Sequence, residues 1–432
     1  MGVVIGVAVA VVVVTLMVGA HLYLWRRLVR DVSSPGHWWR RVGTALFFLL
    51  PLLTVVTFVG GRGGLPFGLV KVIGWPGYLW MPTLLYLFLA LLVGELLRAL
   101  AHRMWRSRNA PTATHAELAV GASTASGQAS PSGPEKASEG GDPPEEREGT
   151  EARTGSTVPD RRRFLAGTLA LGATAVAGGT VAYGTVDVLD GPTLKRQTVR
   201  LAKLPASADG YRLMVVSDLH LSPVLGRGLS ERIVETVNRA RPDAIVIVGD
   251  LVDGTVDDLG PAAAPLARLR AREGVYFVTG NHEYYSGDRP WIDHVRTLGI
   301  EPLVNSHKKL SAFDLAGVND LAGEEESRGP DFERALRGRD RSRALVLLAH
   351  QPSQIHEAVK HGVDLQISGH THGGQVWPGK YLARLANPTV SGLDRYEDSQ
   401  LFVTRGAGAW GPPVRVDAES DVTLLTLRHG RM

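Results

Sequence analysis

Three long apolar runs open the chain. They cover residues 3–24, 43–60 and 78–97, and each approaches the ~20 residues that a helix needs to cross a bilayer. Residues 3–18 are apolar on every face, which excludes a helix half exposed to water, and tryptophans flank the runs as they do at membrane interfaces. The pattern predicts three transmembrane helices within a membrane region at residues 1–104.

A polar stretch follows, and then a milder apolar run. Residues 105–160 are rich in Ala, Ser, Gly, Pro and Glu, with almost no large apolar side chain. Such a segment cannot offset its ordering entropy, so we predict a disordered linker. Residues 164–186 consist largely of Ala, Gly, Thr and Val and come directly after three arginines. We therefore predict a fourth transmembrane helix within residues 161–188.

Basic residues flank these runs unequally. Clusters of arginine follow the first and third runs and precede the fourth, whereas the loop between the second and third runs has only Arg62 and Lys71. The positive-inside rule places such clusters in the cytoplasm. We therefore expect a multi-pass protein of the cell membrane, with the linker inside and the N-terminus and C-terminal domain outside the cytoplasm.

The C-terminal half has the pattern of a soluble enzyme, in which short β-branched runs alternate with helical stretches. Five runs predict buried strands, at residues 212–217, 243–249, 274–279, 344–349 and 363–368. Each ends within a residue or two in a cluster of Asp, His or Asn. Ligand sites in layered α/β folds collect at the carboxyl ends of strands, so this placement indicates a functional site.

These polar clusters follow a fixed order along the chain. They are Asp218-Leu219-His220, Gly249-Asp250-Leu251-Val252-Asp253, Gly280-Asn281-His282-Glu283, His350 and Gly369-His370-Thr371-His372. Taken singly, each reads equally well as a turn or a hydrogen-bonded structural histidine. Five together, each at a strand end, favour chemistry. The chain has no cysteine, so any metal must be held by imidazole, carboxylate and amide oxygen.

The five blocks resemble the pattern of the calcineurin-like metallophosphoesterase superfamily: Asp-x-His, Gly-Asp-x-x-Asp, Gly-Asn-His-Glu/Asp, His and Gly-His-x-His. The resemblance covers residues 199–427 and implies an α/β fold, a two-sheet αββα sandwich preceded here by transmembrane helices. Residues 373–375 and 405–408 further resemble a bacterial subgroup whose members are membrane-attached or exported by the twin-arginine route. Residues 417–420 depart from that subgroup, which often has a Pro-Pro-Glu turn there.

The resemblance implies two divalent metal ions and assigns ligands to each. The residues expected at the first ion are Asp218, His220 and His372. Those expected at the second ion are Asn281, His350 and His370. Two cations that lie close together need negative charge between them, and Asp250 is the candidate for this bridging carboxylate. Nitrogen and oxygen donors suit Mn, Fe and Zn about equally, so the identity of the metal stays open.

Three further residues are expected to assist. In the superfamily the residue matching His282 is not a ligand, and it protonates the leaving group or stabilises developing charge. Asp253 and Glu283 are expected to orient ligand imidazoles, with capping or surface roles as the alternative. The expected function is hydrolysis of a phosphoester by hydroxide generated between the two metals, with His282 as general acid.

Other side chains of this half are expected to be structural or to contact substrate. His294, His307, His356 and His361 fall in predicted helices or turns, so we expect them to be structural or exposed. Substrate choice is expected to rest on loops 284–290, 317–329 and 376–393. An apolar wall at these loops is one role for three tryptophans, and core packing is the role we expect for each: Trp291, Trp377 and Trp410.

Alternative functions differ in what they require. A catalytically silent scaffold for membrane protein assembly would be expected to lack ligands or the acid histidine, and none is missing. A nuclease would need a basic, aromatic-lined groove, and the formal charge of +4 is small and dispersed, so no nucleic acid partner is expected. A transport path would need intramembrane charge, and the first three runs carry only Glu95 as an acid.

The expected partners are therefore the membrane and a phosphoester, and the subgroup resemblance points to lipid-linked or envelope esters. The string Arg161-Arg162-Arg163-Phe164-Leu165 also resembles a twin-arginine signal, which makes the twin-arginine export machinery a candidate partner. Asp160 stands where Ser or Thr is usual, and the segment is internal. The alternative is that these arginines anchor the fourth helix in the cytoplasm, and the two roles are compatible.

Overall fold

The computed structural model describes residues 2–60, 64–108 and 161–430. Apart from its first four residues, the predicted linker lies outside this part of the chain. The four long helices are α1 (Gly2–Trp25), α2 (Trp38–Gly60), α3 (Phe67–Arg108) and α4 (Arg161–Asp190). A short helical segment, Arg26–Arg30, continues α1.

Three of these helices are long and apolar enough to cross a membrane: α2, α3 and α4. Helix α1 is an apolar segment of 24 residues, and most side chains of its first half lie outside the described set. Helix α3 is longer than the predicted run because it begins at Phe67 and continues through Pro76 and Pro82. Prolines are tolerated inside membrane helices because neighbouring groups satisfy the freed backbone.

The C-terminal half folds into two six-stranded sheets. In the order of the first sheet, the strands are β1 (Thr193–Leu201), β12 (Asp421–His429), β2 (Tyr211–Val216), β3 (Ala244–Val248), β4 (Val275–Val278) and β5 (Glu301–Pro302). In the order of the second sheet, they are β10 (Gly392–Tyr396), β11 (Ser399–Val403), β9 (Leu365–Ser368), β8 (Leu345–Leu348), β7 (Asp314–Gly317) and β6 (Ser306–Lys309). Strands β2, β3 and β4 run parallel, as do β8 and β9.

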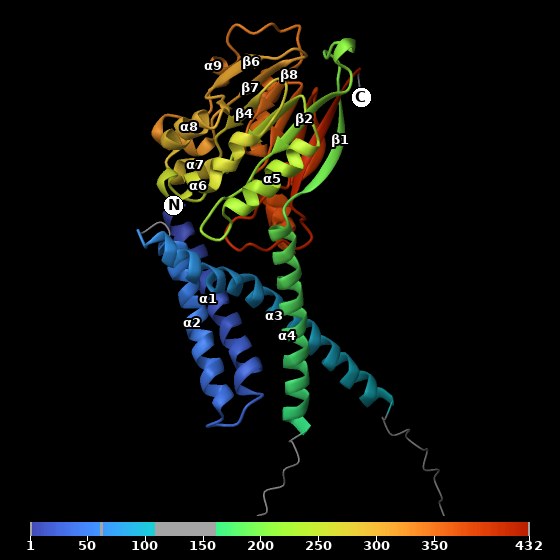
Figure 1. The fold of residues 1–432 in the computed structure, drawn as a ribbon. Helices are drawn as coiled ribbons and strands as arrows, with labels where there is room; N and C mark the ends of the chain where they lie inside the picture. The colour runs from blue at the N-terminus through green and yellow to red at the C-terminus, as the bar shows by residue number, and fades with distance from the viewer. Residues whose placement is uncertain (1, 61–63, 109–160, 431–432) are drawn as a thin grey trace, which may run out of the picture.

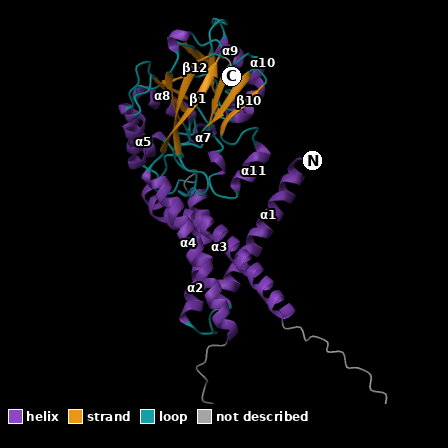
Figure 2. Cartoon of the chain, turned by 90° about the vertical axis from the view of Figure 1, so that its right-hand side faces the viewer, coloured by secondary structure: helices purple, strands orange, loops and turns teal. Residues whose placement is uncertain are grey.

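Helices cover the outer face of each sheet. Those on the first sheet are α5 (Arg227–Arg239), α6 (Val256–Ala263) and α8 (Asp288–Thr297), whereas α7 (Asn281–Ser286) follows β4 and carries site residues (Figure 1, Figure 2). The remaining helices are α9 (Phe332–Leu336), α10 (Ile355–Lys360) and α11 (Gly379–Ala386), and of these α9 and α10 pack on the second sheet. Short 3₁₀ turns complete the domain: Ala206–Ala208, Ala264–Arg268, Leu321–Glu326, Pro352–Gln354 and His372–Gly374.

The core explains why the strands are apolar on both faces. One cluster lies between the sheets and includes Val215 and Val246 of the first sheet and Val346 of the second. The alternate residues, such as Met214 and Ile245, pack against the helices instead. Strands buried on both faces read as continuous apolar runs. The predicted αββα sandwich is confirmed, and each of the five predicted strands is present within a few residues of its expected bounds.

Two expectations about individual side chains are wrong. His307 lies on strand β6 and not in a helix or turn, where its Nδ1 contacts the carbonyl oxygen of Ala335 at 2.7 Å. Trp291 is buried in the core as expected, but Trp377 and Trp410 remain 41% and 45% exposed. These two lie in the loops that face the long helices, where packing is incomplete.

The domain sits on one end of the long helices (Figure 1). Helix α4 runs directly into β1 at this end, whereas the α1–α2 turn, the end of α3 and the start of α4 lie at the opposite end. All three arginine clusters therefore share the end that is remote from the domain. The two parts touch: Tyr86 Oη on α3 donates to the carbonyl oxygen of Trp377 at 3.0 Å, and the amide of Arg415 donates to the carbonyl oxygen of Gly184 on α4 at 3.0 Å.

Candidate metal centre

All the predicted site residues meet at one edge of the sandwich. They follow the carboxyl ends of β2, β3 and β4 in the first sheet and of β8 and β9 in the second. Most are buried, and Asp253 and His370 are partly exposed. The two sheets therefore bring together segments that are far apart in the sequence.

Three sets of three described side chains offer ligand atoms that lie within 4.8 Å of one another, and two of these sets match the expected ligands: Asp218, His220 and His372 in one, and Asp250, His350 and His370 in the other. Asp250 lies between the sets, because its Oδ2 is 3.1 Å from His350 Nε2 and 3.5 Å from His220 Nε2. Asn281 joins the second set through its Oδ1, which lies 3.0 Å from His370 Nδ1. Asp250 therefore contacts a histidine of each set.

Several atoms of the cluster lack the partners that a protein interior normally provides. Asp218 Oδ2 is buried without a hydrogen-bond partner, and His220 Nε2 lies 3.0 Å from His372 Nε2. Burying an unpaired polar atom costs about 1–3 kcal/mol. Imidazole and carboxylate donors gathered in this way suit divalent cations. The residues present therefore fit a divalent metal.

The backbone is strained at these residues. Five of them adopt the left-handed region: Asp218, His220, Asp250, His370 and His372, with φ of 51°, 45°, 51°, 70° and 52°. This region is unfavourable for residues with a Cβ, and strain of this kind concentrates at functional sites. It turns each loop sharply at the strand end, so that successive side chains point into the cluster.

Two glycines of the sequence motifs lie so close to carboxylates of the cluster that no side chain fits there. A Cβ at Gly280 would lie 2.2 Å from Asp250 Oδ1, and one at Gly369 would lie 2.2 Å from Asp218 Oδ2. Any other residue would displace a carboxylate from the cluster. The glycines that precede Asn281 and His370 in the sequence motifs are therefore explained by packing against the ligands.

Asp253 orients two imidazoles. Its Oδ1 lies 2.9 Å from His220 Nδ1 and 2.6 Å from His282 Nδ1. Burial opposes ionisation of Asp253, but the two histidines outweigh this effect and lower its pKa to about 2. The contact fixes Nδ1 of each ring and leaves Nε2 free for chemistry.

Glu283 takes the capping role that was the alternative expectation, and no imidazole of the described residues lies within hydrogen-bond distance of it. Its carboxylate accepts the amide N–H groups of Gly280, Asp250 and Leu251 at 2.7, 3.0 and 2.7 Å. Burial, with a further contribution from Asp250, raises its pKa to about 8. Glu283 therefore acts on the backbone of the loop that carries Asp250.

Burial and nearby carboxylates shift the pKa values of three histidines of the cluster. It lowers the pKa of His370 to about 4 and that of His372 well below its ordinary value. Burial acts in the same direction on His350, but Asp250 and Asp218 more than offset it and raise its pKa well above the ordinary value. Neutral imidazole is the form that binds metal, so the Gly-His-x-His rings are ready to bind at neutral pH.

Sequence reasoning missed Arg415, a fully buried residue beside the cluster. Its guanidinium donates to four carbonyl oxygens, those of Gly408, His372, Ala418 and Arg405, at 2.6 to 3.2 Å. Its Nη2 also lies 3.0 Å from His372 Nδ1. These partners come from separate loops, so no local pattern identifies the residue. The backbone N–H of Arg415 also donates a hydrogen bond to the carbonyl oxygen of Gly184. Arg415 thereby joins helix α4 to the loop that carries His372.

Replacing Arg415 by Lys is expected to destabilise the domain by about 2–4 kcal/mol, because an ammonium cannot reproduce the fork of bonds and leaves buried carbonyl groups unpaired. The midpoint of thermal unfolding of the full chain in detergent measures this loss. The control is Arg395→Lys, at an arginine that is 59% exposed, which should leave the midpoint unchanged. Equal midpoints for both variants would contradict the structural role.

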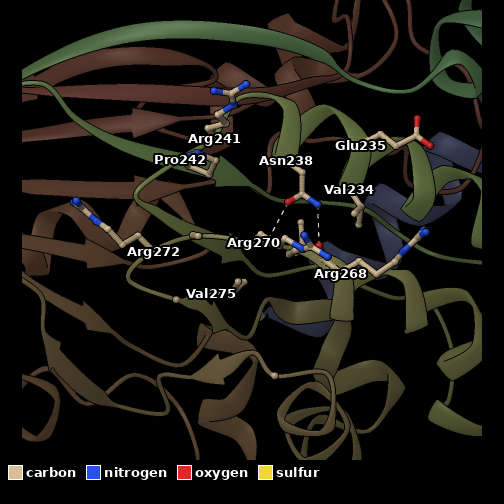
Figure 3. A pocket seen from close by; sticks show the side chains of 13 residues that line it. Val234, Glu235, Asn238, Arg241, Pro242, Arg268, Arg270, Arg272 and Val275 are labelled. Atoms are coloured by element: carbon tan, nitrogen blue, oxygen red, sulfur yellow. Dashed lines mark hydrogen bonds between the residues drawn. The ribbon is translucent and has the colours of Figure 1, made fainter.

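A cavity of about 900 Å³ opens at the opposite, amino ends of β3 and β4. Figure 3 shows arginines around it, among them Arg241, Arg268 and Arg272, with the side chain of Asn238 bonded to the backbone of Arg268 and Arg270. None of the predicted site residues lines it. A second cavity, of about 500 Å³, is lined by Asp253 and His282, so the second one belongs to the metal centre.

A sandwich of two sheets with an Asp, His and Asn cluster at the strand ends is the arrangement that the resemblance to metallophosphoesterases implies. Residues 211–374 match the family model for calcineurin-like phosphoesterases. A transmembrane protein with metallophosphoesterase domain from Danio rerio is 40% identical over 261 residues, which are 57% of this chain and 60% of that protein. An uncharacterized metallophosphoesterase of Helicobacter pylori strain J99 is 35% identical, over 62% of this chain and 73% of that one.

A third relative, an uncharacterized metallophosphoesterase of Aquifex aeolicus, is 33% identical over 54% of this chain and 91% of its own length. The chain belongs to the calcineurin-like metallophosphoesterase family, which confirms the superfamily resemblance. The three candidate spans and the named transmembrane relative make it a membrane protein. Membership of the twin-arginine subgroup stays a prediction.

Proposed function

We propose that this protein hydrolyses a phosphoester at two divalent metal ions. The observation that carries the proposal is the position of Asp250 between two sets of ligand atoms, with Oδ2 within 3.5 Å of a histidine from each. Asp218, His220 and His372 would hold one ion, and Asn281, His350 and His370 the other. When bound, such ions supply positive charge against the phosphate and lower the pKa of a nearby water.

His282 is the proposed general acid. Asp253 holds its Nδ1 at 2.6 Å, which leaves Nε2 to face the substrate. Burial lowers the pKa of His282, but Asp253 and Asp250 raise it more, so that the net pKa lies above the ordinary value. A ring with this pKa keeps its proton near neutral pH and has a proton to deliver to the departing oxygen.

The test is metal-dependent turnover by the full chain in detergent. The protein is stripped with chelator and resupplied with Mn²⁺, Fe²⁺ or Zn²⁺, and hydrolysis of bis-4-nitrophenyl phosphate is compared with that of 4-nitrophenyl phosphate. We expect activity to vanish on stripping and to return with at least one metal, and the two substrates show whether diesters or monoesters are preferred. Inactivity with every metal, in folded protein with two bound ions, would favour the scaffold alternative.

The proposed location of the active site is outside the cytoplasm. The arginine clusters lie at the end of the helices remote from the domain, and the positive-inside rule places that end in the cytoplasm. This supports an envelope or lipid-linked phosphoester as substrate. The twin-arginine export machinery is the proposed partner of the segment that begins at Arg161, a role compatible with cytoplasmic anchoring.

A further inference from the structure

The cavity at His282 has a second wall, made by the membrane helices. Its 500 Å³ lie within the range of ~300–1,000 Å³ that is usual for ligand sites. One side carries the polar groups of the metal centre, including Asp253 and His282. The other side carries apolar residues from the domain-facing ends of α2 and α3 and from the connection between them, among them Phe58 of α2, Leu65 of the connection and Val70 of α3. The cavity is therefore polar at the phosphoesterase site and apolar toward the membrane.

A line of aromatic rings connects these two sides. Tyr78 of α3 contacts Phe58 of α2 with ring centroids 5.1 Å apart, and Phe58 contacts Trp410 at 6.3 Å. Trp410 in turn lies 5.8 Å from the ring of His282. Tyr285 covers another side of His282 at 5.4 Å. An apolar surface thus runs without interruption from the helices to the proposed acid.

The helix wall is held in place by close packing. Thr54 Oγ1 on α2 donates to the carbonyl oxygen of Gly77 on α3 at 2.7 Å, and a Cβ at Gly77 would lie 2.5 Å from Thr57 Oγ1. Small residues at such a contact let two membrane helices approach closely. The helix wall therefore does not depend on a ligand for its shape.

We propose that this cavity takes the apolar chain of an amphiphilic phosphoester, so that the substrate is a lipid phosphoester whose phosphate faces His282. The inference rests on the proposed function and narrows its substrate class. An ester of small polar alcohols would leave the walls of Phe58, Leu65 and Val70 uncovered. A lipid would bury its chain against them while its phosphate reaches the metal centre, and α2 and α3 provide the adjoining path from the bilayer.

The test is a chain-length series with the full protein in detergent. The substrates are methyl, butyl and octyl 4-nitrophenyl phosphate, with methyl, butyl and octyl phosphate as the monoester series. Each buried methylene contributes about fourfold to binding, so burial of only two of the methylenes added between methyl and octyl is expected to raise kcat/KM about tenfold or more. The phosphate chemistry is constant within each series, and only the chain changes.

Variants show whether a preference for long chains comes from the cavity or from partition of the substrate into detergent. Phe58→Ala and Leu65→Ser remove apolar wall, and each is expected to reduce the octyl-to-methyl ratio of kcat/KM several-fold. Leu65 is 37% exposed, so its substitution threatens folding least. The matched control is Val59→Ala, at the neighbouring residue of α2, whose side chain is 63% exposed and outside the cavity. It should keep the wild-type ratio.

The outcomes distinguish this inference from the function on which it rests. Hydrolysis of the methyl ester with a flat chain-length series would overturn the lipid substrate and leave the phosphoesterase intact. A rise that Phe58→Ala, Leu65→Ser and Val59→Ala share equally would assign the preference to the detergent and also overturn it. Loss of all turnover in wild-type protein with restored metal would instead refute the proposed function, and the inference with it.

Discussion

Replacing Asp250 by Asn is expected to lower turnover by at least about 10³-fold and to reduce the bound metal below two ions per chain, because the shared negative charge between the ligand sets is lost. Asparagine keeps the shape of the residue and an oxygen that accepts the amide of His282, as Asp250 Oδ1 does at 2.9 Å. The local backbone should therefore survive. The measurements are kcat/KM and metal content by elemental analysis.

The matched control for this variant is Asp257→Asn, an exposed carboxylate on α6. It removes the same charge outside the candidate metal centre and should change neither activity nor metal content. If Asp250→Asn kept two ions per chain and wild-type turnover, Asp250 would not be the bridge. The pairing of the two ligand sets would then have to rest on another group.

Replacing His282 by Ala is expected to reduce kcat by about 10²–10⁴-fold with metals retained, because the leaving oxygen departs without a proton. The loss should be greatest for an alkyl phosphate, whose alkoxide is a poor leaving group. It should be smaller for a 4-nitrophenyl ester, whose phenolate leaves readily unprotonated. Comparison of kcat for the two esters therefore reports the role of the residue and not only its importance.

His356→Ala is the control, because His356 is an exposed histidine on α10 away from the cluster. Loss of metal in His282→Ala is the contrary result, and it would have a structural basis. His282, His220 and Asp250 also offer ligand atoms within 4.8 Å of one another. If His282→Ala lost metal, and lost activity equally on both esters, His282 would be a ligand instead of the acid.

The positions of the candidate ligands at strand ends could be predicted from sequence, and the contacts between them could not. Asp218, Asp250 and His350 each follow an apolar run, and strand ends are visible as local patterns. The distance between Asp250 and His350 depends on how two separate sheets pack. Glu283 shows the limit most clearly. It lies within a motif, yet its partners are backbone amides, as in the capping role that was the alternative expectation.

Arg415 and the substrate cavity lay beyond sequence reasoning altogether. Arg415 serves carbonyl groups from separate loops, and a buried arginine has no periodicity of its own. Trp410 was expected in the core, but it lies between His282 and Phe58. A residue in a loop takes its environment from whatever element packs beside it. Here that element is a membrane helix about 350 positions earlier in the chain.

The apolar spans, the strand-end clusters and the family can be read from the chain alone, because helix length, side-chain alternation and motif spacing are properties of neighbouring residues. The tertiary structure alone decided that Asp250 stands between two ligand sets and that α2 and α3 close the cavity over His282. These relations join residues that are distant along the chain. Their geometry depends on the packing of whole sheets and helices, which no local pattern encodes.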